Sequence, residues 1–394
     1  MSELAIKGVD RRAMGVLSAG HLFTDVNQGA VAALIPFLVA ERGLSLAAAG
    51  TLVMAATVSS SVVQPLFGIF SDRRPLPGLM PLGLLMAGVG IALAGVAPSY
   101  PWILTCVIFS GIGVAAFHPE AARFANYVSG SRRARGMSFF SVGGNAGFAL
   151  GPVLTTPLVV VFGLPGTLFL AVPAGLMAAV LFVEMARMTS FQPRPQPQPE
   201  AAASVSREPD SGRELWGAFV RMVGVVSLRS FVYFGLVAFV ATYYAQVHDT
   251  SMARGNTALA VMLFAGAIGT LTLGPLADRL GRRAVLGVSM LLLPPLIFGF
   301  TLAGPLWGTV LLAFVGAATI GTFGVTVVMG QEYLPGRIGL AAGITMGLSI
   351  GLGGIGAPIL GLLADAQGLP FMMLVVAALP LLGLLLTLTL PGKH

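Results

Sequence analysis

Charged residues are scarce in this sequence: Lys, Arg, Asp and Glu make up only 9% of the 394 residues, whereas 56% are hydrophobic. Soluble globular domains carry about 25% charged residues, so this composition excludes them. Cysteine is nearly absent, and the single Cys106 cannot form a disulfide within the chain. The sequence also lacks a GxxxxGK[ST] phosphate-binding loop. The sequence therefore gives no sign of a process driven by ATP bound in such a loop.

Most of the sequence consists of long apolar segments. Twelve segments are each at least about 20 residues long, enough for a helix to cross a hydrocarbon core about 30 Å thick. They cover residues 14–40, 46–70, 77–97, 101–127, 136–162, 164–186, 215–247, 256–277, 284–303, 305–331, 338–364 and 369–390. A closed membrane barrel would instead show alternating segments of about ten residues. The sequence predicts an all-α integral membrane protein with twelve transmembrane helices.

Basic residues fall mainly on one side of these predicted spans. If the amino terminus is cytoplasmic, the tails and even-numbered loops hold 17 of the 22 basic residues, and the opposite face holds only Arg42 and Arg254. Cytoplasmic loops of membrane proteins show this excess. We therefore expect a multi-pass protein of the inner or plasma membrane with both termini cytoplasmic. The net charge of +7 follows from that topology and does not indicate nucleic-acid binding.

The spans divide into two groups of six. Between them, residues 187–213 contain four closely spaced prolines, then Ala, Ser and scattered charges, which is the composition of an extended linker. A docking site for a partner is a less favoured interpretation of the prolines. The predicted organisation is an amino-terminal six-helix half over 1–186, a cytoplasmic linker over 187–213, and a carboxy-terminal six-helix half over 214–394.

The two halves repeat each other at an offset of 206 residues. The matching pairs include Gly68 and Gly274, Asp72 and Asp278, Arg73 and Arg279, Tyr127 and Tyr333, and Pro152 and Pro358. Glycine matches carry little weight in a chain with 52 glycines, but matches of Asp, Tyr and Pro at one offset indicate duplication. A parallel duplication of six helices is the arrangement of the two major-facilitator halves.

A charged loop follows the eighth span, in the segment Gly274-Pro-Leu-Ala-Asp-Arg-Leu-Gly-Arg-Arg283. It closely resembles the cytoplasmic loop signature of the major facilitator superfamily. A carboxylate at a helix end can pair with nearby arginines and hold one conformation shut. The first-half copy keeps the Asp and the Arg, but it has Pro75 and lacks the later Gly. The predicted conformational latch comprises Asp72, Arg73, Asp278, Arg279, Arg282 and Glu332, and the alternative is a set of ordinary solvated turn charges.

Small residues recur every few positions in the fifth span, at Gly143, Gly144, Gly147 and Gly151, before Pro152. Such a stripe permits close contact between helices. The run resembles the antiporter signature of exporters in this superfamily. Generic helix packing remains the alternative.

Four further motifs narrow the resemblance. They are His21-Leu-Phe-Thr-Asp-Val-Asn-Gln28, Gln64-Pro65, Phe117-His-Pro-Glu120 and Val142-Gly-Gly-Asn145. In this order they resemble the fosmidomycin-resistance type of efflux transporter. The resemblance implies that the first and fourth spans line a central cavity, and that the substrate is a small drug-like compound such as the phosphonate fosmidomycin.

Polar stripes on those two spans supply the candidate site residues. His21 and Asp25 are four residues apart and share a helix face, as do Glu120 and Arg123 at a spacing of three. Ionisable groups at membrane depth are costly and by default mark a substrate or ion path. The predicted proton-coupling residues are Glu120 and Asp25 as carriers, with His118 and His21 modulating them. The predicted substrate-binding residues are Arg123, Gln28, Asn27, Gln64, Asn145, Arg229 and Tyr233.

Static interpretations of these groups stay open. Asp25 with His21 could be a satisfied polar pair, and Glu120 with Arg123 a static ion pair. Arg229 could snorkel toward the cytoplasm instead of reaching a cavity. On a regular helix His118 points away from the side of Glu120.

The sequence therefore predicts a proton-coupled efflux transporter that works by alternating access, not an enzyme. A proton symporter that imports a small organic anion is the nearer alternative, and a membrane-embedded enzyme or receptor is the more distant one. The expected partners are a small-molecule substrate, protons and the lipid bilayer. We expect a monomer that binds no metal, no other cofactor and no nucleic acid.

Overall fold

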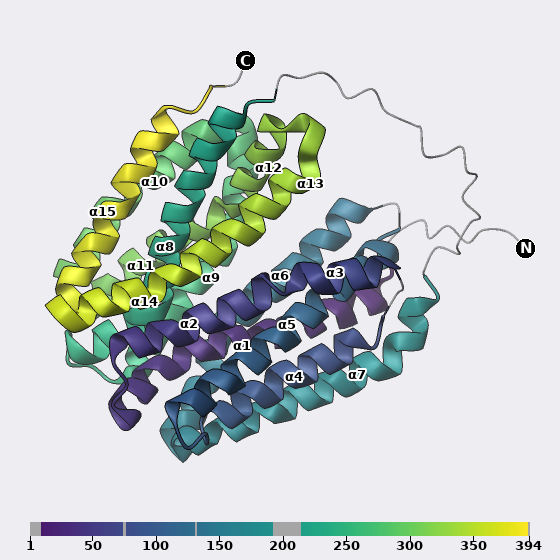
Figure 1. Ribbon diagram of the computed structural model, residues 1–394, viewed down its shortest axis with the longest axis horizontal. Helices are drawn as coiled ribbons and strands as arrows, with labels where there is room; N and C mark the ends of the chain where they lie inside the picture. Colours follow the sequence, from purple (N-terminus) through teal and green to yellow (C-terminus); the bar gives the residue numbers. More distant parts are fainter. Residues whose placement is uncertain (1–8, 74–75, 131, 192–213, 393–394) are drawn as a thin grey trace, which may run out of the picture. The chain divides into compact units, whose positions relative to one another are not determined.

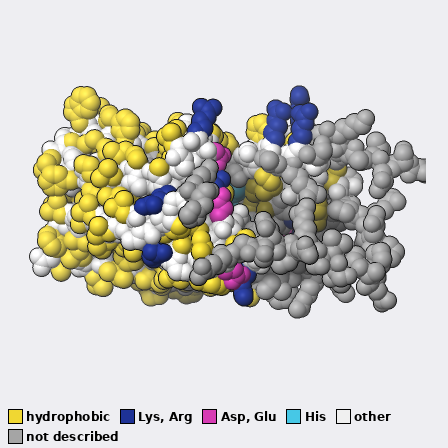
Figure 2. Space-filling model, turned by 90° about the horizontal axis from the view of Figure 1, so that it is seen from above, with side chains coloured by type: hydrophobic (Ala, Val, Ile, Leu, Met, Phe, Trp, Pro, Cys, Tyr) yellow, Lys and Arg dark blue, Asp and Glu magenta, His cyan; other side chains and the backbone are white. Residues whose placement is uncertain are grey.

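The computed structural model describes residues 9–73, 76–130, 132–191 and 214–392, and its regular structure over them is entirely helical (Figure 1). In this part of the chain, eleven helical stretches are long and apolar enough to span a membrane. The apolar helix α4 (Leu79–Ala94) is shorter, with 16 residues, and corresponds to the third predicted span, 77–97, which brings the apolar helical stretches of the described residues to twelve. The outer surface carries many exposed large hydrophobic side chains (Figure 2). The all-α membrane fold is confirmed.

The first compact unit covers residues 1–34 and 55–197. Its elements are α1 (Arg11–Arg42) up to residue 34, α2 (Leu46–Ser61) from residue 55, α3 (Gln64–Arg73), α4, α5 (Tyr100–Val128), α6 (Arg133–Phe162), the 3-10 helix η1 (Leu164–Leu170) and α7 (Ala171–Thr189). Side chains of α1, α4, α5, α6 and α7 form its core, with Leu17, Leu84, Phe117 and Phe124 fully buried. Asp10 begins α1, because its carboxylate accepts a hydrogen bond of 2.8 Å from the Ala13 amide.

The second compact unit covers residues 35–54 and 198–394. Its elements after the predicted linker are α8 (Trp216–Gln246), α9 (Met252–Leu280), α10 (Arg282–Leu302), α11 (Pro305–Gly321), α12 (Phe323–Tyr333), η3 (Pro335–Arg337), α13 (Ile338–Gly343), the π-helical turn η4 (Ile344–Leu348), α14 (Ser349–Gln367) and α15 (Leu369–Leu388). Helix α8 packs against α9, α14 and α15, and α11 packs against α9 and α10. Helix α8 is thus the central element of this unit.

Three predicted spans contain an interruption. The span 46–70 divides into α2 and α3 at a turn over residues 62–63, just before Pro65, which has no backbone N–H to continue the helical ladder. The span 305–331 divides into α11 and α12 at Thr322. The span 338–364 contains the π-helical turn η4. Apolar composition predicts where a chain crosses the membrane, but not where its helix is broken.

The beginning of α2 belongs to the second unit because it packs directly on α14. Both carboxylate oxygens of Asp365 accept hydrogen bonds from the first turn of α2, at 2.8 Å from Leu46 N and 2.9 Å from Ala47 N. A Cβ atom built on Gly361 would lie 2.4 Å from the Leu46 oxygen, so the two backbones touch. The predicted division of the chain into two halves by a linker over residues 187–213 stays a prediction, and most of that linker lies outside the described residues.

The glycine stripe of α6 makes a close helix contact, and its partner is α1. A Cβ built on Gly143 would lie 2.4 Å from the Ser18 oxygen, one on Gly147 2.1 Å from the Leu22 oxygen, and one on Gly151 2.4 Å from the Gly29 carbonyl carbon. Real Cβ atoms do not come this close to backbone atoms. Helices α1 and α6 therefore meet backbone to backbone over about three turns.

Gly147→Val is expected to destabilise the protein by about 2–3 kcal/mol, because the added side chain must push α6 away from α1. The measurement is the thermal unfolding midpoint of the purified protein in detergent. Gly175→Ala in α7 is the matched control, since nothing lies within 4 Å of its added Cβ. An unchanged midpoint for Gly147→Val would contradict the close contact.

Candidate functional site

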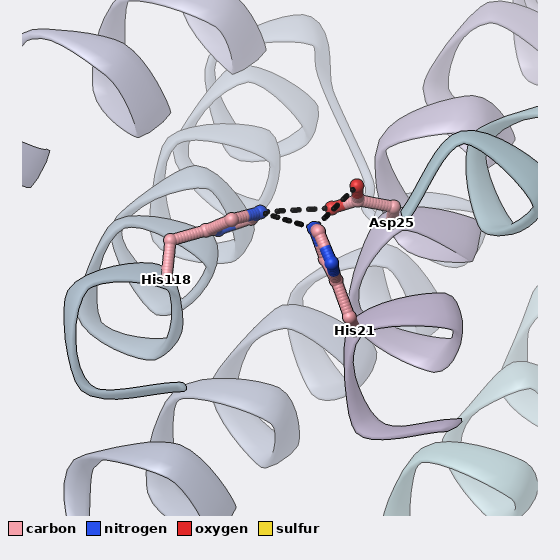
Figure 3. A group of neighbouring side chains, drawn as sticks. All are labelled: His21, Asp25 and His118. Carbon is pink, nitrogen blue, oxygen red and sulfur yellow. Dashed lines mark hydrogen bonds and ion pairs between the residues drawn. The ribbon is translucent and has the colours of Figure 1, made fainter. Parts of the chain in front are cut away.

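Helices α1 and α5 bring the side chains of His21, Asp25 and His118 together (Figure 3). The two Nε2 atoms of His21 and His118 lie 3.1 Å apart. His21 Nε2 is 3.3 Å from Asp25 Oδ2, and His118 Nε2 is 3.3 Å from Asp25 Oδ1. We call these three residues the imidazole–carboxylate cluster.

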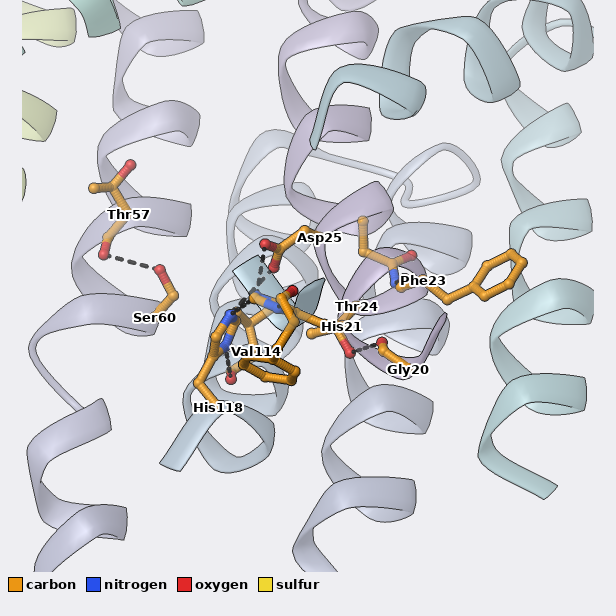
Figure 4. Close-up of polar contacts among 11 residues, drawn as sticks. Gly20, His21, Phe23, Thr24, Asp25, Thr57, Ser60, Val114 and His118 are labelled. Carbon is orange, nitrogen blue, oxygen red and sulfur yellow. Dashed lines mark hydrogen bonds and ion pairs between the residues drawn. The ribbon is translucent and has the colours of Figure 1, made fainter. Parts of the chain in front are cut away.

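Backbone carbonyls fix how both imidazole rings are turned. His21 Nδ1 lies 2.8 Å from the Phe140 oxygen of α6, and His118 Nδ1 lies 2.8 Å from the Val114 oxygen one turn earlier in α5 (Figure 4). A carbonyl oxygen can only accept, so each Nδ1 must carry a hydrogen. The neutral form of each ring then presents a bare lone pair at Nε2, and both lone pairs face the Asp25 carboxylate.

With both rings neutral and Asp25 ionised, the cluster contains no hydrogen-bond donor that points into it. Two Nε2 lone pairs and a carboxylate are all acceptors, and Asp25 Oδ1 is buried without a hydrogen bond of good geometry. Unsatisfied buried acceptors are costly. One extra proton, carried by either Nε2, supplies the missing donor and balances the carboxylate charge.

The same spacing suits a metal ion as well as a proton. One ligand atom from each of the three residues can be chosen so that all lie within 4.8 Å of one another. Metal-bound histidines commonly donate their other ring N–H to a carbonyl, as both rings do here. The geometry therefore suits a small cation, either a proton or a metal ion. The side chains are only 11–20% exposed, so the site is largely closed to solvent but not sealed.

Gly144 supports the cluster from α6. A Cβ atom at this position would lie 2.4 Å from His21 Nε2 and 2.8 Å from Asp25 Oδ2. No larger residue fits without displacing both side chains. The sequence pointed to Gly144 as part of a packing stripe and of the Val142–Asn145 motif, and it gave no signal for the carbonyls of Phe140 and Val114. A carbonyl exists at every position, so its role appears only when the helices are placed.

Glu120 lies away from the cluster, as the two-residue spacing from His118 predicts. Its side chain is fully buried, and Oε1 accepts a hydrogen bond of 2.9 Å from the Leu76 amide, which precedes α4. Arg123 Nη1 lies 3.7 Å from the same oxygen. The pair thus joins α5 to the segment between α3 and α4. A carrier role for Glu120 and a substrate role for Arg123 both stay predictions.

The other predicted polar residues are not drawn into one group. Asn27 is buried and donates to the Phe23 oxygen at 2.8 Å in its own helix. Gln28, Gln64 and Asn145 are partly exposed. In the second unit, Arg229 is buried and Tyr233 partly exposed on the same face of α8.

Part of the predicted latch forms within the second unit. Arg282 Nη2 lies 3.1 Å from Asp278 Oδ1, and Arg282 Nη1 also bonds Glu332 at the end of α12. Arg279 is exposed, and no ion pair joins it to the described residues. The side chains of Asp72 and Arg73 lie outside the described part, so the first-half copy stays a prediction. Arg282, rather than Arg279, is the centre of the described charge group.

Comparison with known families and proteins gives a consistent result. A family model described as Major Facilitator Superfamily matches residues 17–354. An uncharacterized MFS-type transporter, YfnC of Bacillus subtilis, is 34% identical over 376 residues, covering 94% of this chain and 90% of that protein. The fosmidomycin resistance protein of Escherichia coli is 32% identical over 385 residues, covering 97% of this chain and 93% of that protein.

Solved structures agree at the level of the fold. A bacterial homolog of the human lysosomal transporter Spinster, in an inward-facing and occupied conformation, matches with a TM-score of 0.74 and 16% identity over 96% of both chains. The nucleoside transporter NupG matches with a TM-score of 0.75 and 13% identity, covering 96% of this chain and 99% of that chain. Identities this low support the fold alone.

Proposed function

This chain belongs to the major facilitator superfamily, and from that premise we propose that it exports small polar compounds, fosmidomycin among them, in exchange for protons. Its family and fold are those of transporters and not of enzymes. The substrate proposal rests on the identity of 32% to the fosmidomycin resistance protein over nearly the whole chain. Export by alternating access would follow the general scheme for paired six-helix halves.

The imidazole–carboxylate cluster is the single observation that carries proton coupling. His21, Asp25 and His118 form a group that is short of one donor, and a single proton completes it. Asp25 lies 14 residues from the start of α1 and 17 from its end, since 25 − 11 = 14 and 42 − 25 = 17. Such a group at mid-span has no structural need to be ionisable unless it binds and releases a charge.

The proton would act by changing the forces within the cluster. With the proton bound, one Nε2 donates to the other ring or to Asp25, and α1 and α5 are held together. Without the proton, two lone pairs and a carboxylate repel one another across about 3 Å. Among the described residues, the nearest other charged groups on α5, Glu120 and Arg123, pair with each other. Proton release would therefore loosen the contact between α1 and α5.

The proposal also includes the membrane in which the protein lies, the side on which its termini lie, and its oligomeric state. The excess of basic residues supports cytoplasmic termini in the inner or plasma membrane. The charge group around Arg282 would act as a latch for one conformation. A monomer whose only coupling ion is the proton accounts for the proposed activity.

Transport into inverted membrane vesicles tests the proposal. Vesicles that contain the protein and have an acid lumen should accumulate fosmidomycin, and a protonophore should abolish the accumulation. Uptake into right-side-out vesicles with an acid exterior would instead indicate the importing symporter. Chemical modification of the compound without movement would indicate an enzyme. Loss of transport on adding a metal chelator would show that the cluster holds a metal ion instead of a proton.

A further inference from the structure

A second charged site lies in the middle of α8. Arg229 is 13 residues from the first residue of this helix, since 229 − 216 = 13, and 17 residues from the last. At about 1.5 Å per residue it is about 20 Å from the nearer end. Its side chain is only 3% exposed. The guanidinium is therefore held at membrane depth and does not snorkel to the surface.

The guanidinium has few partners for its five N–H donors. Nη1 donates to Thr322 Oγ1 at 2.9 Å, and the carbon Cζ lies 5.7 Å from the centre of the Phe323 ring. Thr322 Oγ1 in turn donates to the Ala318 oxygen at 3.2 Å, which leaves its lone pairs for Arg229. These contacts orient the guanidinium but do not neutralise it.

No described carboxylate forms an ion pair with Arg229. Four described carboxylates that follow the linker in the second unit have other partners. Asp278 and Glu332 pair with Arg282, and Glu214 pairs with Arg337. Asp365 accepts hydrogen bonds from backbone amides of α2. Arginine stays protonated in proteins. A buried charge without a counter-ion is strongly unfavourable. An anion bound beside Arg229 supplies the counter-charge that the described residues do not.

The partner Thr322 lies where the backbone is irregular. Helix α11 ends at Gly321, and α12 begins at Phe323, with Thr322 at φ −87° and ψ 1° between them. Interrupted helices at membrane depth occur where they are buried in protein or line a cavity, and ligand sites are commonly built there.

The 206-residue repeat relates the positions of this site to positions close to the imidazole–carboxylate cluster in the sequence. Arg229 corresponds to Phe23 and Thr322 to Ala116, since 229 − 206 = 23 and 322 − 206 = 116. Both counterparts are two residues from a cluster member, Asp25 and His118. In the repeat, the Arg229 site and the cluster thus fall close to corresponding sequence positions of the two halves.

We propose that Arg229, oriented by Thr322 and Phe323, binds the anionic oxygen-bearing group of the exported compound, a phosphonate in the case of fosmidomycin. A guanidinium can bind two oxygens of such a group through parallel charge-assisted hydrogen bonds. This inference rests on the proposed export function and assigns its substrate class. It favours Arg229 over Arg123, whose guanidinium lies beside Glu120.

The test compares fosmidomycin with its uncharged phosphonate diester in transport by vesicles. Arg229→Gln should raise the KM for fosmidomycin at least about ten-fold, the effect of losing about 1.4 kcal/mol of binding, with the KM for the diester unchanged. Arg229→Lys should give an intermediate KM, because lysine keeps the positive charge but lacks the planar guanidinium that can bind two oxygens at once. Arg221→Gln is the matched control, since Arg221 lies on α8 but is exposed and bonds the Thr389 oxygen. An equal change for both compounds, or none, would overturn the proposal.

A binding measurement separates this inference from the transport function. Fosmidomycin should raise the thermal unfolding midpoint of the purified wild-type protein and not that of Arg229→Gln, because a ligand stabilises only the state that binds it. If wild-type vesicles transport neither compound, the export proposal fails, and this shift alone decides the anion site. A shift of equal size in both proteins would overturn the site even if export is confirmed.

Discussion

Replacing Asp25 with asparagine is expected to abolish accumulation of fosmidomycin driven by an acid vesicle lumen. Asparagine has nearly the shape of aspartate, but its amide group donates a hydrogen bond to an Nε2 lone pair and removes the negative charge. The cluster is then satisfied without a proton. Exchange of labelled for unlabelled compound at equal pH should persist, because that process needs no proton. Uptake and exchange assays on the same vesicles measure the two effects.

Asp10→Asn is the matched control for this substitution. Asp10 lies just before α1, where burial would raise the pKa of its carboxyl, but the Ala13 amide and the Arg187 guanidinium outweigh that effect and hold the pKa below its usual value. It therefore carries a charge at neutral pH but does not touch the cluster. Asp10→Asn should keep pH-driven accumulation. Accumulation by Asp25→Asn with the pH dependence of the wild type would remove the cluster from the coupling mechanism.

Glu120→Gln is the second substitution for which we expect loss of proton-driven transport. The glutamine retains an oxygen that can accept from the Leu76 amide, as Glu120 Oε1 does at 2.9 Å. It loses only the charge beside Arg123 and the ability to exchange a proton. The protein should therefore remain folded in the membrane, with an unfolding midpoint close to that of the wild type, while accumulation falls to the level of protein-free vesicles.

Two further variants make the Glu120 result decisive. Glu184→Gln changes another buried carboxylate, one that pairs with Arg12 in the same unit, and it should leave proton coupling intact. Glu120→Ala also removes the acceptor for Leu76 and should lower the unfolding midpoint. If Glu120→Gln transports with normal pH dependence, Glu120 serves only to hold the segment before α4.

The sequence predicted the membrane fold well because its evidence is local. An apolar run of about 20 residues predicts a span regardless of what surrounds it. The spacing of four residues between His21 and Asp25 likewise predicts a shared face from one helix alone. The α6 glycines predicted a close helix contact, and the structure identifies α1 as the partner.

The parts that could not be predicted depend on how helices are placed against one another. The spacing of His118 from Glu120 indicates opposite faces of α5, but only the packed structure shows that His118, and not Glu120, meets His21 and Asp25. The helix break at Thr322 could not be predicted either, because no proline lies at or next to that position. Pairings across helices follow from tertiary packing, which a single sequence does not reveal.

The backbone contact between α1 and α6 also has an entropic consequence. An interface of glycines immobilises no side-chain rotamers when it forms, so the two helices are joined with little loss of conformational freedom. The backbone positions of His21 and Phe140 are then set by main-chain contact, so the Phe140 carbonyl is held in place for the His21 ring. We therefore expect thermal motion to change the distance between the α1 and α6 backbones very little at this level, which keeps the Phe140 carbonyl within hydrogen-bonding reach of His21 Nδ1.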